Sequence, residues 1–196
     1  MRPCYSQCVA ELTITPNYDS ERFRRLALYI ASRSSNDPAF GKTKLAKLLF
    51  YRDFLAYGEL GSPITGATYS KFPYGPFPRV LSDELNKLED LGEGVVVPAD
   101  YFGQEQERLV ALKEIDAAIF SSPEISIVEQ VLEALRDEDA AGVARLSHLE
   151  PAWQFVEEWK AIPYELAFVS GDPPSEEALR VGEEVAERLG LVSSAQ

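Results

Sequence analysis

The residue types that do chemistry at neutral pH are scarce in this chain. Histidine is the usual proton shuttle, and His148 is the only histidine in the sequence. No Ser-His-Asp or Cys-His set can be built without it, and the two cysteines, Cys4 and Cys8, lie far away near the amino terminus. The sequence therefore offers no nucleophile and base that act together. We expect a protein that is not an enzyme.

The patterns that bind metals or nucleotides are incomplete. Cys4 and Cys8 lack the second Cys or His pair of a zinc site, and His148 has no nearby Asp-x-Asp or His-x-x-Glu partner. The GKTK sequence at 41–44 resembles the end of a phosphate-binding loop, but Asn36 stands where the first glycine of that loop belongs. We interpret the many carboxylate pairs as solvated helix faces. We expect no metal ion and no cofactor.

Charge is distributed unevenly along the chain. Residues 1–58 carry nine Arg or Lys and five Asp or Glu, a balance of +4. Residues 59–196 carry ten and twenty-seven, a balance of −17, and the two parts sum to the net charge of −13. An acidic surface repels phosphate backbones and suits a basic protein partner, because complementary fields speed association. It also keeps a protein in solution, and both interpretations stay open.

Apolar residues are spread through the chain and form no long run. No stretch reaches the ~18 to 20 apolar residues that a membrane span needs. The amino terminus lacks the apolar segment of a secretory signal. We therefore expect a cytoplasmic protein with no membrane partner.

Hydrophobic spacing predicts mostly helices in the first half of the chain. Ser20 is expected to cap the first helix, and residues 42–57 and 78–91 form the next two. Between them, residues 64–78 predict a strand or an extended loop, with a tight Gly-Pro turn at 75–76. The residues expected to face inward on these helices are Phe23, Leu26, Ala27, Ile30, Leu45, Leu48, Leu49, Leu55, Leu81, Leu85 and Leu88.

Two short β-rich runs, 94–98 and 108–112, predict an antiparallel hairpin with a long, wing-like loop. Three short helices followed by such a hairpin resemble a winged helix-turn-helix, so a DNA-binding regulator is the alternative function. Against it, the basic helix at 42–57 is so apolar that much of its surface must be buried, and the wing is acidic. We do not expect a nucleic-acid partner.

The second half of the chain adds further helices. Ser122 is expected to cap one of them, with Pro123 in its first turn, and shorter helices are predicted at 139–146 and 151–159. A last helix follows Ser175, and four of its residues are expected to face the body: Ala178, Val181, Val185 and Leu189. The predicted fold class is α+β, a mostly helical single domain with one small antiparallel β-hairpin.

Five local strings occur in an order and at a spacing typical of one family. They are GKTKLAKLLFYRDF at 41–54, G-SPITG-ATY at 61–69, YGPFPRVL at 74–81, LSHLEPAW at 146–153 and IPYELAF at 162–168. From about Ser20 to Val169 the chain thus resembles the Panacea domain, also called the SocA-like antitoxin domain.

The resemblance implies a bacterial or phage antitoxin that neutralises a cognate toxin, usually encoded next door, by direct protein contact. Neutralisation could proceed by covering the toxin's active surface or by delivering the toxin to a protease. Residues 1–19 form a leader, residues 20–170 the antitoxin domain, and residues 171–196 an acidic helix and tail. The two ends lie outside the family pattern and could hold toxin contacts.

Eight residues are our candidates for contacting the partner: Lys42, Lys44, Tyr69, Phe72, Tyr74, Phe77, His148 and Trp153. Each has a competing structural interpretation. The four rings between 69 and 77 could be core, and the lysines, together with Lys47, could form a solvated face. His148 and Trp153 could stabilise the Glu150-Pro151 junction, with the Trp153 ring packed over His148.

Overall fold

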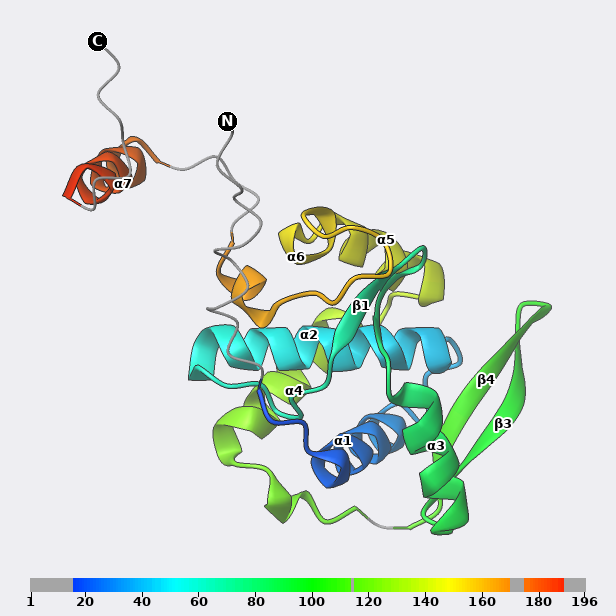
Figure 1. Cartoon of the computed structure of the whole chain (residues 1–196). Coiled ribbons are helices and arrows are strands. Elements are labelled where there is room, and N and C mark those ends of the chain that lie inside the picture. The colour runs from blue at the N-terminus through cyan, green and yellow to red at the C-terminus, as the bar shows by residue number, and fades with distance from the viewer. Residues whose placement is uncertain (1–15, 114, 170–174, 189–196) are drawn as a thin grey trace.

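A mostly helical body carries one projecting β-hairpin (Figure 1). The computed structural model describes residues 16–113, 115–169 and 175–188. The elements are α1 Ser20–Arg33, α2 Lys42–Leu60, β1 Tyr69–Phe72, β2 Gly75–Pro78, α3 Leu81–Asp90, β3 Gly94–Tyr101, β4 Gln104–Ala111, η1 Ala117–Ile119, α4 Ser122–Ala134, α5 Ala140–Leu149, α6 Pro151–Gln154, η2 Tyr164–Phe168 and α7 Glu176–Arg188. The expected α+β class is confirmed, but there are two antiparallel hairpins, β1–β2 and β3–β4, where the sequence predicted one.

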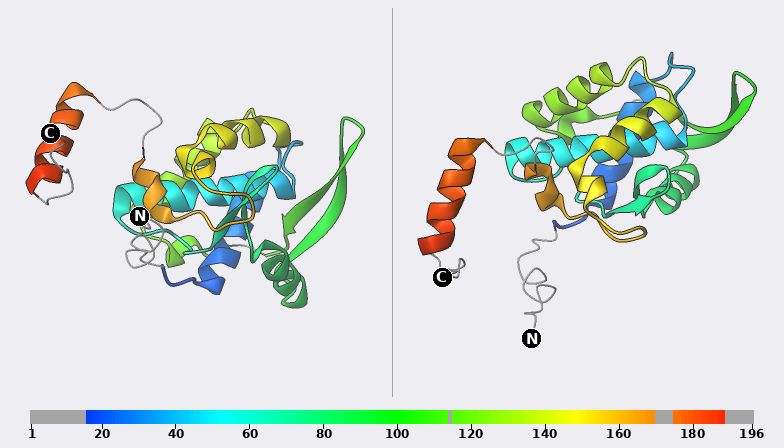
Figure 2. Two further views of the ribbon diagram at one scale, coloured as in Figure 1. Left: turned by 45° about the horizontal axis from the view of Figure 1, so that its top comes forward. Right: turned by 90° about the horizontal axis from the view of Figure 1, so that it is seen from above.

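The central element is α2, which is buried on nearly all sides. The helices α1, α4 and α5, the turn η2 and strand β2 all pack against it (Figures 1 and 2). Its low amphipathicity follows from this position, because a helix surrounded by other elements needs no polar face. The predicted inward-facing residues are confirmed as core, except that Leu55 is only half-buried.

Two lysines on α2 contradict the expected solvated face. Lys44 Nζ donates to Asp37 Oδ2 at 2.8 Å and to the carbonyls of Arg136 and Glu138 at 3.0 and 2.5 Å. Lys47 Nζ donates to the Pro76 carbonyl at 2.8 Å, and burial lowers the pKa of Lys47 to about 8. Both side chains are almost completely buried, because distant loops supply acceptors that local sequence does not reveal.

A buried carboxylate joins α2 to the segments that follow it. Asp53 accepts hydrogen bonds from the backbone N–H of Thr65 at 2.7 Å, from the Thr65 hydroxyl, and from the hydroxyls of Tyr69 and Tyr164 at 2.8 and 3.3 Å. Burial raises the pKa of Asp53, while these four donors oppose the shift. Tyr69 is therefore core and cannot contact a partner, contrary to our prediction.

The β1–β2 hairpin replaces the predicted Gly-Pro turn. The turn lies at Pro73 and Tyr74, and Phe72 pairs with Gly75, which already belongs to β2. Gly75 has φ 93°, and a Cβ there would meet the Ser147 hydroxyl and lie 2.7 Å from Lys47 Cε. Glycine is thus required twice, by the backbone conformation and by the close approach of the hairpin to α5.

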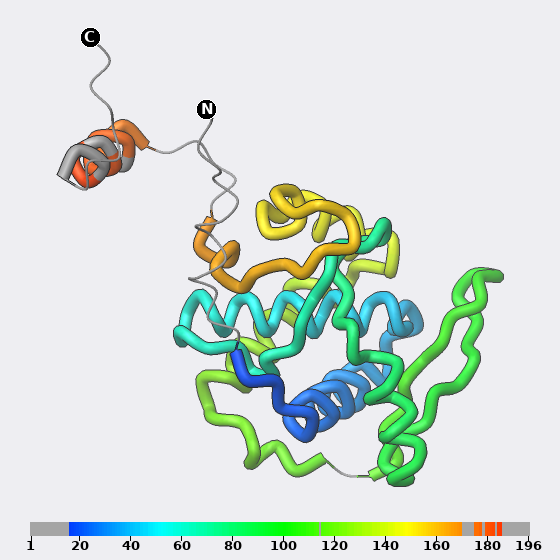
Figure 3. Tube along the Cα trace, in the orientation of Figure 1, coloured from blue at the N-terminus to red at the C-terminus, as the bar shows by residue number. Residues whose placement is uncertain are grey.

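The other side of β1 is paired with a segment from far along the chain. The Lys71 N–H donates to the Lys160 carbonyl at 3.0 Å, and the N–H groups of Trp159 and Ile162 donate to the Lys71 and Tyr69 carbonyls at 2.7 and 2.8 Å. Figure 3 shows this segment running beside β1. Prolines are tolerated in β2 because its outer edge has no ladder partner in the described residues.

The projecting hairpin, which we call the wing, consists of β3 and β4. The predicted long loop is wrong, since each strand has eight residues and only Phe102 and Gly103 connect them. Residues 99–107, which lie between the two predicted β-rich runs, form the outer half of the wing. Because this half has solvent on both faces, its sequence is polar and lacks the apolar alternation of a half-buried strand.

Several helix ends differ from prediction by short distances. Asp19 caps α1 in place of Ser20, and Ser121, in a capping box with Glu124, caps α4 in place of Ser122. The predicted helix at 151–159 ends at Gln154, because the chain then leaves to pair with β1. The two cap errors arise because neighbouring Ser and Asp residues are equally good caps.

The expectation for the last helix is wrong in one respect. Val181 and Val185 of α7, which were expected to face the body, are exposed in the structure. The amphipathic pattern predicted a helix correctly, but such a pattern does not specify which surface its apolar face meets. Most of the predicted leader with its two cysteines, together with Leu189 and the Ala178 side chain, lies outside the described residues. Among the described residues, no helix combines the length and apolar character needed to cross a bilayer.

Candidate functional site

The tip of the wing presents an aromatic residue in a strained conformation. Phe102 and Gly103 both have positive φ, 50° and 79°, as a two-residue hairpin turn requires. A left-handed conformation is costly for a bulky residue, yet Phe102 is 92% exposed and therefore gains little from packing. Among the described residues, its one aromatic pair is with the Tyr101 ring, edge to face at 4.9 Å. Strain without local compensation points to a role outside the folded chain.

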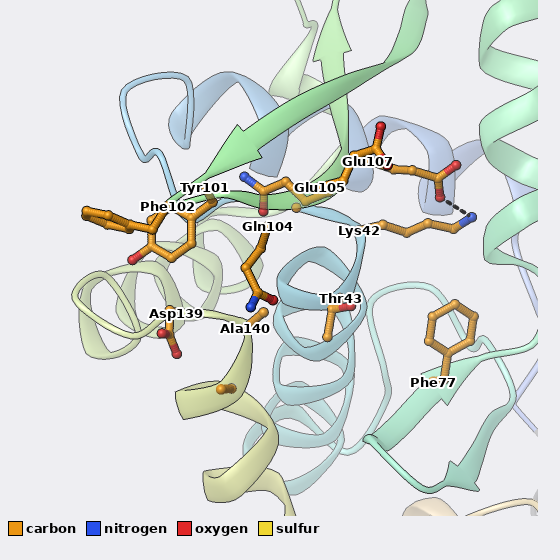
Figure 4. Close-up of a pocket in the computed structure, with 13 residues that line it drawn as sticks. Lys42, Thr43, Phe77, Tyr101, Phe102, Gln104, Glu105, Glu107, Asp139 and Ala140 are labelled. Atoms are coloured by element: carbon orange, nitrogen blue, oxygen red, sulfur yellow. Dashed lines mark hydrogen bonds and ion pairs between the residues drawn. The ribbon is translucent and has the colours of Figure 1, made fainter.

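Between the wing and the body lies an open groove of about 890 Å³, which we call the wing groove (Figure 4). The start of α2 and the start of α5 form its body side, and the outer half of the wing forms the other side. Its lining residues are Gly41, Lys42, Thr43, Phe77, Tyr101, Phe102, Gln104, Glu105, Gln106, Glu107, Asp139, Ala140 and Ala141.

Specific contacts hold the wing in place over the body. Lys42 Nζ pairs with Glu107 at 3.1 Å across the groove. At the base, Gln106 Nε2 donates to the Pro38 carbonyl at 2.8 Å, and the Arg108 guanidinium donates to the Asp37 carbonyl at 2.6 Å. The wing is therefore braced on the loop that precedes α2 and presents a preformed surface.

The wing groove is acidic. Glu105, Glu107 and Asp139 line it, and Lys42 is the only cation among the lining residues. Lys42 is already paired with Glu107, so Glu105 and Asp139 have no cationic partner among the lining residues, although Asp139 caps α5 and accepts from the Gly142 N–H at 2.7 Å. Such a surface complements basic side chains.

Aromatic side chains continue from the groove onto the body. Phe77 lines the groove and packs against Phe72 with ring centroids 5.7 Å apart, and Phe72 in turn meets Trp159 edge to face at 5.0 Å. Trp159 is 57% exposed, and Tyr74, at the turn of the same hairpin, is 77% exposed. We call Phe72, Tyr74, Phe77 and Trp159 the aromatic ridge. Rings of this kind are typical anchors of protein interfaces.

The remaining candidates form a separate stack. The rings of His148 and Trp153 stack with centroids 4.2 Å apart, and Lys71 Nζ lies 4.0 Å from the Trp153 ring centroid. Burial lowers the pKa of His148, as do the positive charges of Lys47 and Lys71, although a hydrogen bond to the Pro73 backbone opposes them. The predicted packing of Trp153 over His148 is confirmed, and this stack fastens the β1–β2 turn to α5.

Comparison with known proteins places these features in one family. The sequence profile described as "Antitoxin SocA-like, Panacea domain" matches residues 45–154, more than half of the chain. The chain belongs to the SocA-like antitoxin family. No match was found among curated proteins or among solved structures.

The matched segment of this antitoxin runs from the first turns of α2 to the end of α6. It therefore includes the Asp53 hydrogen bonds to Thr65 and Tyr69, the β1–β2 hairpin and the whole wing. Lys42, Trp159 and α7 lie outside it. Family membership implies an antitoxin role and a cognate toxin as partner, and it suggests a protein that is not an enzyme.

Reactive side chains in the antitoxin are placed for stability. Lys47 and Ser147 approach each other behind Gly75, but both are almost completely buried and the Ser147 hydroxyl donates to the Ala144 carbonyl at 2.8 Å. Asp53 is likewise enclosed by its donors. In the described part of the chain, no three His, Cys, Asp or Glu side chains are grouped as a metal site would require.

Sequence reasoning located part of this surface. Lys42 and Phe77 both line the wing groove and Phe72 packs against Phe77, whereas Lys44 is buried. Phe102 was not among the candidates. An aromatic residue followed by glycine between two short β-rich runs could have indicated an exposed ring in a tight turn.

Proposed function

We propose that this antitoxin neutralises its toxin by direct contact through the wing groove and the aromatic ridge. The observation that carries the proposal is Phe102, an exposed ring in a left-handed conformation above an open groove. Membership of an antitoxin family makes a toxin the partner, and the geometry supports this surface as the point of contact.

The surface has the properties of a protein-binding site. A stable interface buries about 1,200–2,000 Å² in total and depends on a few aromatic or Arg anchors. Phe102 supplies an exposed ring at the groove, and Tyr74 and Trp159 supply exposed rings on the aromatic ridge. Because the wing is braced through Gln106 and Arg108, little conformational entropy is lost when the partner binds.

The charge of the site favours a basic toxin surface. Glu105, Glu107 and Asp139 lie around the groove, and the whole chain carries a net charge of −13. Opposite charge on the toxin would raise the association rate, and this contribution weakens as salt is added.

Burial of the basic residues of α2 argues against the DNA-binding alternative. Lys44, Lys47 and Arg52 are almost completely buried, and Lys42 is paired with Glu107. On α2, therefore, no basic face is left to contact phosphates, on which duplex binding mainly depends. The wing is acidic as well, so the protein-binding proposal fits the charges better.

The test is co-expression with the neighbouring toxin gene, followed by copurification. We expect the antitoxin to restore growth and to form a complex with the toxin. An Ala141→Arg variant, which fills the wing groove from the start of α5, should lose both. Asn86→Arg, which adds the same side chain to the exposed face of α3, should retain both.

Three results would count against the proposal. Full rescue by the Ala141→Arg variant would show that the groove is not the contact surface. Absence of any complex with an adjacent gene product would contradict direct binding. If rescue disappears and toxin levels rise in cells that lack a protease, the antitoxin acts by delivering the toxin to that protease and not by blocking the toxin surface.

A further inference from the structure

A second groove in the molecule is lined mainly by apolar residues, unlike the acidic wing groove. It has a volume of about 470 Å³ and lies between α2, α4, α5, α6 and η2. Its lining residues are Phe50, Tyr51, Phe54, Leu55, Gly58, Val131, Ala134, Leu135, Leu146, Leu149, Glu150, Pro151, Ala152, Leu166, Ala167 and Val169. Leu149 is 69% exposed at its rim, and Phe168, next to Val169, is also exposed. An open apolar surface of this kind is costly in water unless something covers it.

The same chain contains an apolar helix face without a partner. Leu179, Val181 and Val185 of α7 are all exposed. At about 100° per residue they fall on one half of the helix circumference. Arg180 and its ion-pair partners Glu177 and Glu184 occupy the other half. Thus α7 has one apolar face that is free and one charged face on which a single cation, Arg180, pairs with both Glu177 and Glu184.

The connection between groove and helix is short. Val169 is the last residue of the groove lining, and α7 begins at Glu176. The intervening residues, 170–175, can span at most about 20 Å, which matches the length of about 20 Å for a helix of thirteen residues. A tether of this length gives an effective concentration in the millimolar range, so weak apolar contacts suffice to hold the helix in the groove.

Charge at the groove rim also fits α7. Arg145 on α5 is exposed and makes no ion pair or hydrogen bond within the described residues. It lies beside Leu146 and Leu149, which belong to the apolar groove. A free cation at the rim complements the acidic face of α7, where Glu177 and Glu184 outnumber Arg180.

We propose that α7, whose apolar face is exposed in the structure, docks in solution in the apolar groove of its own chain, with Leu179, Val181 and Val185 directed inward. Docking covers Leu149 and Val169 and leaves the charged face of the helix in solvent. The C-terminal helix thereby acts as a cover for an apolar surface that is separate from the wing groove, whether or not a toxin is present.

Hydrogen exchange of the full chain, followed by mass spectrometry, tests this proposal. An isolated helix of thirteen residues is marginal in water, so an undocked α7 would exchange almost freely. We expect the amides of α7 to exchange at least about tenfold more slowly than in a peptide of residues 175–188. Val185→Asn should remove this protection and should also speed exchange in α5. Glu176→Asn, which places the same new residue on the charged half of the helix away from the Arg180 ion pairs, should leave both unchanged.

A variant in the groove provides the reciprocal measurement. Leu149→Asn, at an exposed position whose replacement does not disturb the core, should lower the protection of α7 as much as Val185→Asn does. Free exchange of α7 in the wild-type chain would overturn the proposal. So would protection that rises with protein concentration, because the groove would then be filled by a second copy.

Discussion

Replacing Phe102 by glycine should separate the stability of this antitoxin from its affinity for the toxin. The substitution removes one ring contact with Tyr101, worth about 0.5–1.5 kcal/mol. It relieves a left-handed conformation that costs a bulky residue about 1–2 kcal/mol, and it adds about 0.5–1 kcal/mol of chain entropy to the unfolded state. These contributions nearly cancel. We expect the free energy of unfolding to change by less than about 1 kcal/mol.

Binding should respond strongly to the same change. If Phe102, now 92% exposed, becomes buried against the toxin, its loss removes about 1.5–3 kcal/mol of apolar burial. Because 1.4 kcal/mol corresponds to a factor of ten, the Kd should rise about 10- to 140-fold. Titration calorimetry with the purified toxin measures the Kd, and urea denaturation measures the free energy of unfolding.

Phe155→Gly is the matched control. Phe155 is also exposed, at 69%, but does not line the wing groove. Its loss should change the Kd by less than about threefold, since exposed residues outside an interface contribute little. An unchanged Kd in folded Phe102→Gly would refute the reasoning, as would an equal loss in Phe155→Gly. Destabilisation by more than about 2 kcal/mol would refute the argument from strain.

Three further predictions concern stability and can be checked by urea denaturation. Lys44→Met should lower the free energy of unfolding by about 3 kcal/mol, because Asp37 and two backbone carbonyls lose their nearly buried donor. Lys42→Met should lower it by less than about 1 kcal/mol, because the ion pair with Glu107 is more exposed. Burial raises the pKa of Asp53 in the folded state, so the ionised carboxylate lowers the free energy of unfolding at neutral pH. The wild-type chain should therefore gain stability relative to Asp53→Asn as the pH falls from 7 toward about 4. The pKa of Glu84 is shifted in the opposite direction. Burial raises this pKa, but the hydrogen-bond donors around the carboxylate lower it by more, so the net shift is downward. The advantage of the wild-type chain over Glu84→Gln should be complete above about pH 5 and should be lost as the pH falls below about 4.

The helical part of the fold could be predicted because its signal is local. Apolar residues at helical spacing identified the inward faces of α1, α2 and α3, and the pattern needs no knowledge of the partner element. The β-hairpins were predicted less well. The outer wing lies in solvent on both faces and so lacks alternation, and β2 is rich in proline and glycine, which indicate a turn in sequence.

Burial of polar residues could not be predicted, since it depends on partners distant in sequence. Lys44 is buried because the loop between α4 and α5 brings two carbonyls to it, and Tyr69 is buried because Asp53 accepts its hydroxyl. The candidate site was predicted in part for a related reason. Sequence identified an aromatic, basic segment, but only the folded chain shows that Phe77 and Lys42 meet beneath the wing while Lys44 turns away.

The close approach at Gly75 has a consequence for how the recognition surface can change. A Cβ at this position would clash with Ser147 on α5 and Lys47 on α2, and the positive φ also favours glycine. The hairpin carries part of the aromatic ridge, and α5 supplies one wall of the wing groove. Change of the proposed contact surface toward a different toxin is therefore expected at rim side chains such as Tyr74, with glycine kept at position 75.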